Sequence, residues 1–243
     1  MIAVPLTSIA GHHPLGASTG VVGFGDDWPA LVRAACGISA HAVELAALDA
    51  AELPGLKAFL DERPRLPFRC VSVHAPVKGL GPVDDVQRAA ELARLPLSVR
   101  SIVVHPDLIE DPAPYRALGR RLVLENMDDR KADGRTAQEL APLFEELPEA
   151  GFCLDVAHAH TVDSSMGVGA ELLDAYRCRL REVHLSSIRG GAHVELTPED
   201  EVLFAPLLGR CRDVPWILEA APPARWAVPA RSRLRAVGER LAA

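Results

Sequence analysis

The sequence predicts an α/β fold, a single (β/α)8 TIM barrel of eight parallel strands with outer helices. The chain has 243 residues, close to the ~250 that are typical of one such barrel. Apolar runs of strand length alternate with stretches that have helical periodicity. Six of these runs end in a histidine or a carboxylate, and functional groups of such barrels lie at the C-terminal ends of the strands. Residues 1–243 are therefore expected to form one domain.

The six strand-end residues are the centre of this prediction. They are all of types that bind metal ions: His74, His105, Glu125, Asp155, His184 and Glu219. Successive side chains of a strand point to opposite faces, so the residue two positions earlier in each run points the same way. Closure of the barrel would then gather all six side chains at one rim.

The position of the first strand is open. Residues 2–6 are apolar, but Pro5 makes them a poor central strand, so 1–13 can be an N-terminal extension and residues 14–19 the first strand. The other strands are expected at 41–47, 68–74, 101–105, 121–125, from 151, up to 184 and up to 219. Helices are expected at 26–36, 52–62, 83–94, 114–118, 134–147, from 197 and at 225–241. Gly37 should follow the end of the first helix, and residues 162–176 should form a loop that leads into a helix.

Composition limits the class of protein. The formal net charge is −7, which argues against a generally cationic nucleic-acid-binding surface, although a local basic groove remains open. The apolar runs are too short for a membrane span, and the N-terminus has no basic segment of the kind that precedes a secretory signal. We therefore expect a cytoplasmic protein. Its five cysteines are scattered without a C-x-x-C pair, which indicates buried, reduced thiols.

The three carboxylates of the set predict a metal site. Glu125, Asp155 and Glu219 would repel one another at one barrel mouth, and their pKa values would rise. Divalent cations between them would remove this repulsion, and charged side chains are rarely buried unless they are paired or bind a metal. Histidine and carboxylate ligands without thiolates suit Zn, Mn, Fe or Co. We expect one or two such ions per chain.

Residues near these strand ends are secondary candidates. His158 lies on a predicted loop after Asp155 and is a candidate metal ligand or substrate contact. His193 could reach the metal ions, and Arg189 could bind a hydroxyl or phosphate group of a substrate, because its planar fork suits oxyanions. Cys153 shares the direction of Asp155 but lies one layer deeper, in the core. His160 is expected to be a solvated loop residue, and three further histidines are expected to be structural or solvated: His12, His13 and His41.

Short motifs at the strand ends resemble one known superfamily. They are His74-Ala75-Pro76, Val103-Val104-His105-Pro106, Leu124-Glu125-Asn126-Met127, Leu154-Asp155-Val156-Ala157-His158-Ala159, Val183-His184-Leu185-Ser186 and Leu218-Glu219. In this order they look like the xylose isomerase-like barrel superfamily. That superfamily groups sugar and sugar-phosphate isomerases and epimerases with apurinic-site nucleases of the endonuclease IV type. The resemblance covers roughly residue 14 to the C-terminus.

The resemblance implies roles for these residues. Four match the metal ligands of the epimerase-like members, in which the two glutamates are also catalytic and move protons: Glu125, Asp155, His184 and Glu219. His74 and His105 match ligands of an additional metal that Glu125 bridges in the nuclease-like members. His158 and His193 match ligands of a third metal. Gly191 departs from the nuclease pattern, which has an aspartate there, so a complete third site is not expected.

Three functions follow. The first is a metal-dependent isomerase or epimerase of a small sugar, sugar phosphate or polyol. The second is metal-assisted hydrolysis of phosphodiesters in abasic DNA, and the third is a metal-binding barrel without catalysis. Short loops, the acidic charge and Gly191 favour the first, whereas His74 and His105 favour the second. The expected partner is a small carbohydrate-like molecule; a homo-oligomer remains open.

Overall fold

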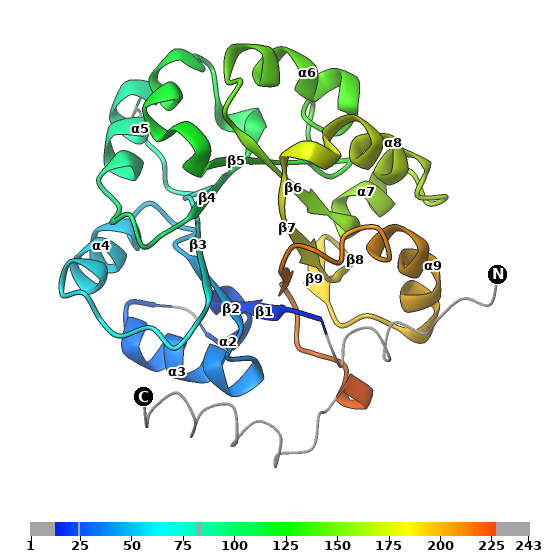
Figure 1. The fold of residues 1–243 in the computed structure, drawn as a ribbon, viewed down its shortest axis with the longest axis horizontal. Helices are drawn as coiled ribbons and strands as arrows, with labels where there is room; N and C mark the ends of the chain where they lie inside the picture. Colours follow the sequence, from blue (N-terminus) through cyan, green and yellow to red (C-terminus); the bar gives the residue numbers. More distant parts are fainter. Residues whose placement is uncertain (1–12, 24, 82–83, 227–243) are drawn as a thin grey trace.

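The computed structural model describes residues 13–23, 25–81 and 84–226, and eight parallel strands close into a barrel within them. The strands are neighbours in chain order around the ring. They are β1 (Leu15–Ser18), β2 (Ala42–Ala46), β3 (Cys70–His74), β4 (Ser101–Val104), β5 (Leu122–Glu125), β6 (Gly151–Asp155), β7 (Leu180–Leu185) and β10 (Trp216–Leu218). Figure 1 shows them in the middle of the molecule, with helices around them. The predicted fold class is confirmed.

Helices follow the strands and form the outer layer. They are α2 (Thr19–Val22), α3 (Trp28–Ile38), α4 (Leu53–Asp61), α5 (Asp85–Ala93), α6 (Ala137–Glu146), α7 (Val156–Val162), α8 (Gly167–Tyr176) and α9 (Pro198–Leu208). Short 3-10 helices lie at Pro106–Leu108, Ala113–Arg121, Arg177–Arg179 and Ala224–Trp226. Local sequence explains where several helices begin. The side chains of Asp84, Thr136 and Thr197 each accept a hydrogen bond from the backbone N–H three residues later and so cap α5, α6 and α9.

The hydrophobic core has two parts. The larger part packs between strands and helices, and its biggest fully buried side chains include Trp28, Phe152, Phe204 and Trp216. The smaller part is a cluster inside the barrel that consists of Val103, Val123 and Cys153. Cys153 is therefore a core residue, as its strand position predicted. The interior of this barrel is a packed layer of side chains, on top of which the strand-end residues lie.

The first barrel strand is β1, and the earlier apolar stretch lies in residues 1–12, outside the described part of the chain. The predicted end of the first helix is wrong, since Gly37 lies inside α3 and Ser39 follows the helix. Residues 114–118 belong to a 3-10 helix rather than an α-helix, in which Gly119 has a positive φ of 54°. The helix expected at 225–241 lies almost wholly outside the described residues.

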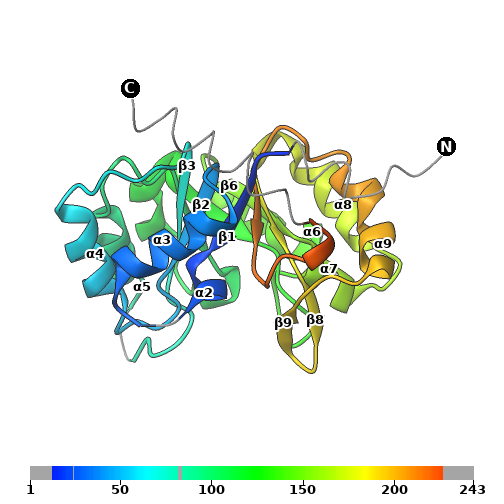
Figure 2. The ribbon, with the colours of Figure 1, turned by 90° about the horizontal axis from the view of Figure 1, so that it is seen from below.

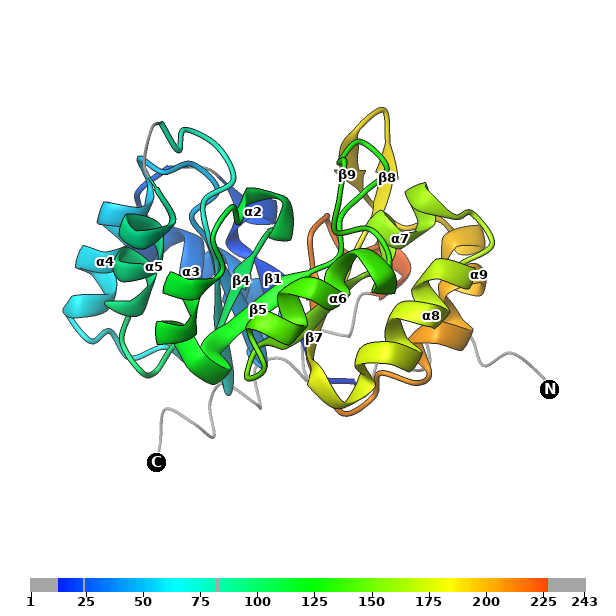
Figure 3. The same cartoon turned by 90° about the horizontal axis from the view of Figure 1, so that it is seen from above.

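Two elements after the strands were not predicted. Residues 156–162 form α7, because the Asp155 side chain caps it by accepting the backbone N–H of His158 at 2.7 Å. Residues after β7 form an antiparallel hairpin of β8 (Ser187–Arg189) and β9 (Ala192–Val194). Gly190 and Gly191 form its turn with φ values of 60° and 80°, as a two-residue type I′ turn requires. Figures 2 and 3 show this hairpin projecting from one end of the barrel.

The five cysteines differ in how far they are buried. All five cysteines lie in the described part of the chain and are free thiols, but only Cys153 and Cys211 are buried and Cys178 is exposed. The expectation that all are buried is therefore wrong.

His13 is structural, since its ring stacks on Trp216 with 3.7 Å between centroids, and burial lowers its pKa to about 4. Among the described residues, no helix has the length and apolarity that crossing a bilayer requires.

A glycine in β1 permits close packing inside the barrel. A Cβ at Gly16 would lie 2.7 Å from both Ala42 Cβ and Ile217 Cδ1. We expect Gly16→Ala to lower the free energy of unfolding by about 1–3 kcal/mol, because overpacking forces such neighbours apart. The control is Gly37→Ala in α3, where an added Cβ meets no described atom within 4 Å and helix propensity should raise stability by up to about 1 kcal/mol. Urea denaturation measures both; equal stability of the two variants would contradict this packing argument.

Candidate metal centre

The six strand-end residues meet at the C-terminal end of the barrel. His74, Glu125 and Asp155 are the last residues of β3, β5 and β6, whereas His184 is the fifth of six residues in β7. The other two directly follow their strands: His105 after β4 and Glu219 after β10. The helix α7 and the β8–β9 hairpin stand at the same end (Figures 2 and 3). The closed parallel sheet thus gathers side chains that are up to 145 residues apart in sequence, from 74 to 219.

Glu125 lies at the centre of this group. Its side chain is buried, and its two oxygens face different pairs of histidines. Oε1 is 3.3 Å from Nδ1 of His158 and 3.3 Å from Nδ1 of His184. Oε2 is 3.3 Å from Nε2 of His74 and 3.5 Å from Nε2 of His105. The carboxylate therefore separates two groups of potential metal ligands.

The other two carboxylates extend the first group. Glu219 Oε1 is 3.3 Å from Nδ1 of His184, and its Oε2 is 3.3 Å from Nδ1 of His193 on β9. Asp155 Oδ2 is 3.6 Å from Nδ1 of His158. Asn126 ties the ends of β5 and β6 together, since its amide nitrogen donates to the Asp155 carbonyl and its amide oxygen accepts the Asp155 N–H, both at 2.9 Å. This clamp was not predicted, although Asn126 directly follows Glu125.

The carboxylates do not all have raised pKa values. Burial raises the pKa of Asp155 well above its ordinary value, and the charges of Glu219 and Glu125 add to this. Burial alone would also raise the pKa of Glu125 and Glu219, but the charge of His184 and of other nearby histidines brings both well below the usual range. The expected rise is therefore wrong for these two residues, because imidazoles at about contact distance supply the opposite charge.

The pKa values of two buried histidines, His74 and His158, are raised. Burial alone lowers the pKa of His74, but its hydrogen bond to Glu125 and the charge of Glu44 raise it to about 9. Burial likewise lowers the pKa of His158, but the charge of Asp155 and the contact with Glu125 raise it to about 10. The pKa of His105 is lowered, because burial prevails there. Without metal, protons on imidazoles thus compensate the buried carboxylates.

The donor atoms fit a divalent cation. One atom each from Glu125, Asp155, His184 and Glu219 lie within 4.8 Å of one another, and so do atoms of His74, Glu125 and His184. Several of these atoms are buried and have no hydrogen-bond partner among the described residues: Glu125 Oε1, Asp155 Oδ2, His184 Nδ1 and Glu219 Oε2. Buried polar atoms without a partner are costly. Nitrogen and oxygen donors in this arrangement match the ligands of zinc and other first-row metals.

The secondary candidates lie around this group. His158 is buried in α7 rather than on a loop, and the His193 ring is 5.5 Å from the His158 ring, centroid to centroid. His160, in the same helix, is half-buried with its ring edge-on to Phe204, so its prediction as a solvated loop residue is wrong. Arg189 on β8 donates to Asp200 at 2.7 Å. Its role as a substrate contact stays a prediction.

Two glutamates that the sequence analysis did not single out as candidates are buried inside the barrel. Glu44 Oε2, from the middle of β2, is 3.0 Å from Nε2 of His184, and both side chains are fully buried. Glu182 lies two residues before His184 on β7. Burial and the charge of Glu44 raise the pKa of Glu182 to about 7. The sequence signal was a glutamate within the otherwise apolar segment Ala42–Ala46.

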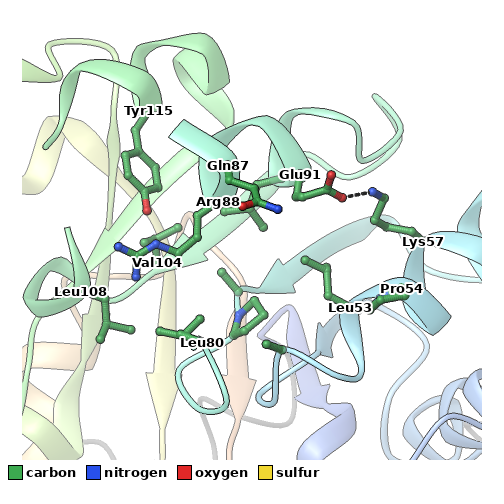
Figure 4. Close-up of a pocket in the computed structure, with 14 residues that line it drawn as sticks. Leu53, Pro54, Lys57, Leu80, Gln87, Arg88, Glu91, Val104, Leu108 and Tyr115 are labelled. Carbon is green, nitrogen blue, oxygen red and sulfur yellow. Dashed lines mark hydrogen bonds and ion pairs between the residues drawn. The ribbon is translucent and has the colours of Figure 1, made fainter. Parts of the chain in front are cut away.

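A cavity of about 270 Å³ lies beside the barrel, between α4 and α5. Leu53, Leu80 and Leu108 are among its mostly apolar lining residues, and the ion pair of Lys57 with Glu91 stands at one side (Figure 4). Val104 of β4 also lines it. Since alternate residues of a strand point to opposite faces, this cavity and the cluster inside the barrel are on opposite sides of β4.

No protein-family model matches the chain, and no curated protein sequence matches it. Solved structures do resemble it. Endonuclease IV from Thermus thermophilus has 21% identity and a TM-score of 0.53, over 90% of this chain and 97% of that chain. A D-tagatose 3-epimerase-like protein has 18% identity and a TM-score of 0.54, over 94% and 99%. A xylose isomerase domain containing protein from Salmonella typhimurium has 13% identity and a TM-score of 0.55, over 93% of this chain and 95% of that chain. This chain thus shares its barrel fold with these proteins.

Proposed function

We propose that the protein is a divalent-metal-dependent isomerase or epimerase of a small sugar, sugar phosphate or related polyol. One observation carries this proposal: Glu125 and Glu219 each place an oxygen 3.3 Å from the same nitrogen of His184, within a group of four donors. Two carboxylates at one metal site suit proton transfer at a carbon next to a carbonyl. The likeness of the fold to a D-tagatose 3-epimerase-like protein supports the same reading.

The chain offers ligands for one or two ions. Glu125, Asp155, His184 and Glu219 would hold the main ion, and His74 and His105 with the second oxygen of Glu125 would hold another. Zn, Mn, Fe and Co all suit these donors. When bound, such an ion polarises the carbonyl and hydroxyl oxygens of a substrate as a Lewis acid.

The two glutamates would move the proton. Glu125 comes from β5 and Glu219 from the end of β10, with β6 and β7 between these strands. The two carboxylates therefore reach the space above the barrel from different sides. One takes the proton from the carbon next to the carbonyl, and a carboxyl group returns a proton to that carbon or to its neighbour. His193, whose Nδ1 is 3.3 Å from Glu219 Oε2, is placed to hold a proton at that oxygen.

A second candidate function is metal-assisted hydrolysis of phosphodiesters. The observation that favours it is the pair His74 and His105, which face Oε2 of Glu125 at 3.3 and 3.5 Å. Two ions separated by one carboxylate would stabilise both the attacking and the leaving oxygen. Against it stand the net charge of −7 and Gly191, whose carbonyl accepts a hydrogen bond from Arg130 at 2.9 Å. A guanidinium thus lies beside the position where the nuclease pattern has an aspartate.

Exchange of substrate hydrogen with solvent tests the proposed reaction. We expect the Mn- or Co-loaded protein to introduce deuterium from D2O at the carbon next to the carbonyl of a ketose. Glu219→Gln should slow this exchange at least about 100-fold, because general bases contribute about 10²–10⁴. Glu146→Gln on α6, which removes a surface ion pair with Arg116, is the matched control. NMR of the sugar measures the exchange. If a broad panel of sugars shows none with the unmutated protein, binding without turnover is the better account.

A DNA assay separates the two candidate activities. We expect no metal-dependent cleavage of an oligonucleotide that contains one abasic site, because the protein is acidic and the third ligand set is incomplete. The measurement is gel electrophoresis after incubation with Zn or Mn. Efficient cleavage that a His74→Ala, His105→Ala double variant loses would establish the hydrolase and refute the isomerase.

Metal binding should compete with protons. The pKa values of His74 and His158 are raised to about 9 and about 10, so both imidazoles are protonated at neutral pH and must release a proton to bind an ion. Apparent affinity should therefore rise with pH, roughly tenfold per pH unit for each proton released. Titration with Co at about pH 6, 7 and 8 measures this, with an indicator dye for released protons. An affinity independent of pH would contradict the proton-filled cluster.

A further inference from the structure

A carboxylate from the barrel interior contacts Nε2 of His184, the ring nitrogen that does not face Glu125 and Glu219. Glu44 Oε2 is 3.0 Å from Nε2 of His184, and both side chains are fully buried. Glu44 lies on β2 and His184 on β7, with β1 and β10 between these strands in the ring. The contact therefore runs through the interior of the barrel and is not a neighbour contact within the sheet.

The two nitrogens of His184 face different surroundings. Nδ1 is 3.3 Å from an oxygen of Glu125 and 3.3 Å from an oxygen of Glu219, so it faces the donors of the candidate metal centre. Nε2 faces Glu44. A neutral imidazole carries one proton, and the hydrogen bond of one nitrogen decides which nitrogen keeps its lone pair for a metal. An acceptor at Nε2 leaves the lone pair on Nδ1.

Another histidine of the centre has a backbone acceptor for this purpose. His74 Nδ1 is 2.9 Å from the carbonyl of Ala75. For His74 this directs Nε2 toward Glu125. His184 instead faces a charged side chain from another strand, so a single substitution can remove its partner.

The interior layer around Glu44 is polar on one side only. Ser72 pairs with Glu44 in the register of β2 and β3, and Glu182 contributes a second carboxyl group. Val103, Val123 and Cys153 form the apolar side. Glu44 Oε1, Ser72 Oγ and Glu182 Oε1 have no hydrogen-bond partner among the described residues, and Glu44 Oε2 and His184 Nε2 have none there besides their 3.0 Å contact with each other. Apolar side chains would fill this space without the cost of burying carboxylates, so packing alone does not explain Glu44.

We propose that Glu44 is a positioning residue that accepts the Nε2–H of His184 and so directs the Nδ1 lone pair toward the bound metal. This inference rests on the metal centre of the proposed function. Partners of this kind orient the imidazole ring and increase its basicity, and their loss commonly weakens metal binding 10- to 100-fold.

Cobalt titration of the metal-free protein tests this role. The variants are Glu44→Ala, Glu44→Gln and, as a control from the same buried layer, Glu182→Gln. We expect Glu44→Ala to weaken Co binding about 10- to 100-fold. Glu44→Gln should lose less, because its amide oxygen can still accept the Nε2–H, and Glu182→Gln should stay close to the unmutated protein. Circular dichroism of each metal-free variant shows whether it is folded; should Glu44→Ala unfold, the comparison of the two glutamine variants decides.

NMR of the Co-loaded protein gives a second measurement, which reports directly on the imidazole ring of His184. In the Co-loaded protein, the proton on Nε2 of His184 should give a paramagnetically shifted NMR signal that exchanges with D2O and is absent from His184→Ala. We expect this signal to persist in Glu44→Gln and Glu182→Gln and to vanish in Glu44→Ala through rapid solvent exchange. Loss of stability alone would not produce this pattern.

Three outcomes would overturn the proposal. Unchanged Co affinity and an unchanged signal in Glu44→Ala would show that Glu44 does not position His184. Loss of one bound ion in both Glu44→Gln and Glu182→Gln would show that a cation lies between these carboxylates, where atoms of both and of His184 lie within 4.8 Å. Failure of the unmutated protein to bind Co, Mn or Zn would refute the metal centre itself and thus this inference with it.

Discussion

The buried charge of Glu125 is the constraint on which the rim of this barrel depends. Its two oxygens have four imidazole nitrogens within 3.5 Å, on histidines that come from three strand ends and one helix. An ionised carboxylate in such a place is stable only with positive partners. Protons on the histidines or divalent cations can supply that charge, and both would occupy the same space. A metal ion that binds at the rim would therefore replace protons on the histidines.

The same residues also organise the backbone near the site. Asp155 supplies a candidate ligand oxygen, and its other oxygen caps α7, which places His158 beside Glu125. Asn126 holds the ends of β5 and β6 in register through two hydrogen bonds and offers its carbonyl to His158. Side chains that are fixed by such contacts lose little freedom when an ion binds, which favours binding.

Sequence patterns predicted the features that depend on local chemistry. Strand length, alternation and strand-end residues identified seven of the strands and the six residues that meet at the rim, because each is determined within a few residues. Glu44 was missed because its contact with His184 exists only once the barrel closes and brings β2 and β7 to face each other. The lowered pKa values of Glu125 and Glu219 were missed for the same reason, since they depend on distances to histidines of other strands.

The geometry of Glu125 links the number of ions to the type of reaction. If His74 and His105 hold a second ion, both oxygens of Glu125 are ligands, and neither is free to accept a proton from carbon. Such a carboxylate suits a bridge between two ions, as phosphodiester hydrolysis uses. With a single ion on the side of Asp155, His184 and Glu219, Oε2 of Glu125 faces two imidazoles and can exchange protons with them. A single ion would therefore leave Glu125 able to move a proton, and a second ion would leave that task to Glu219.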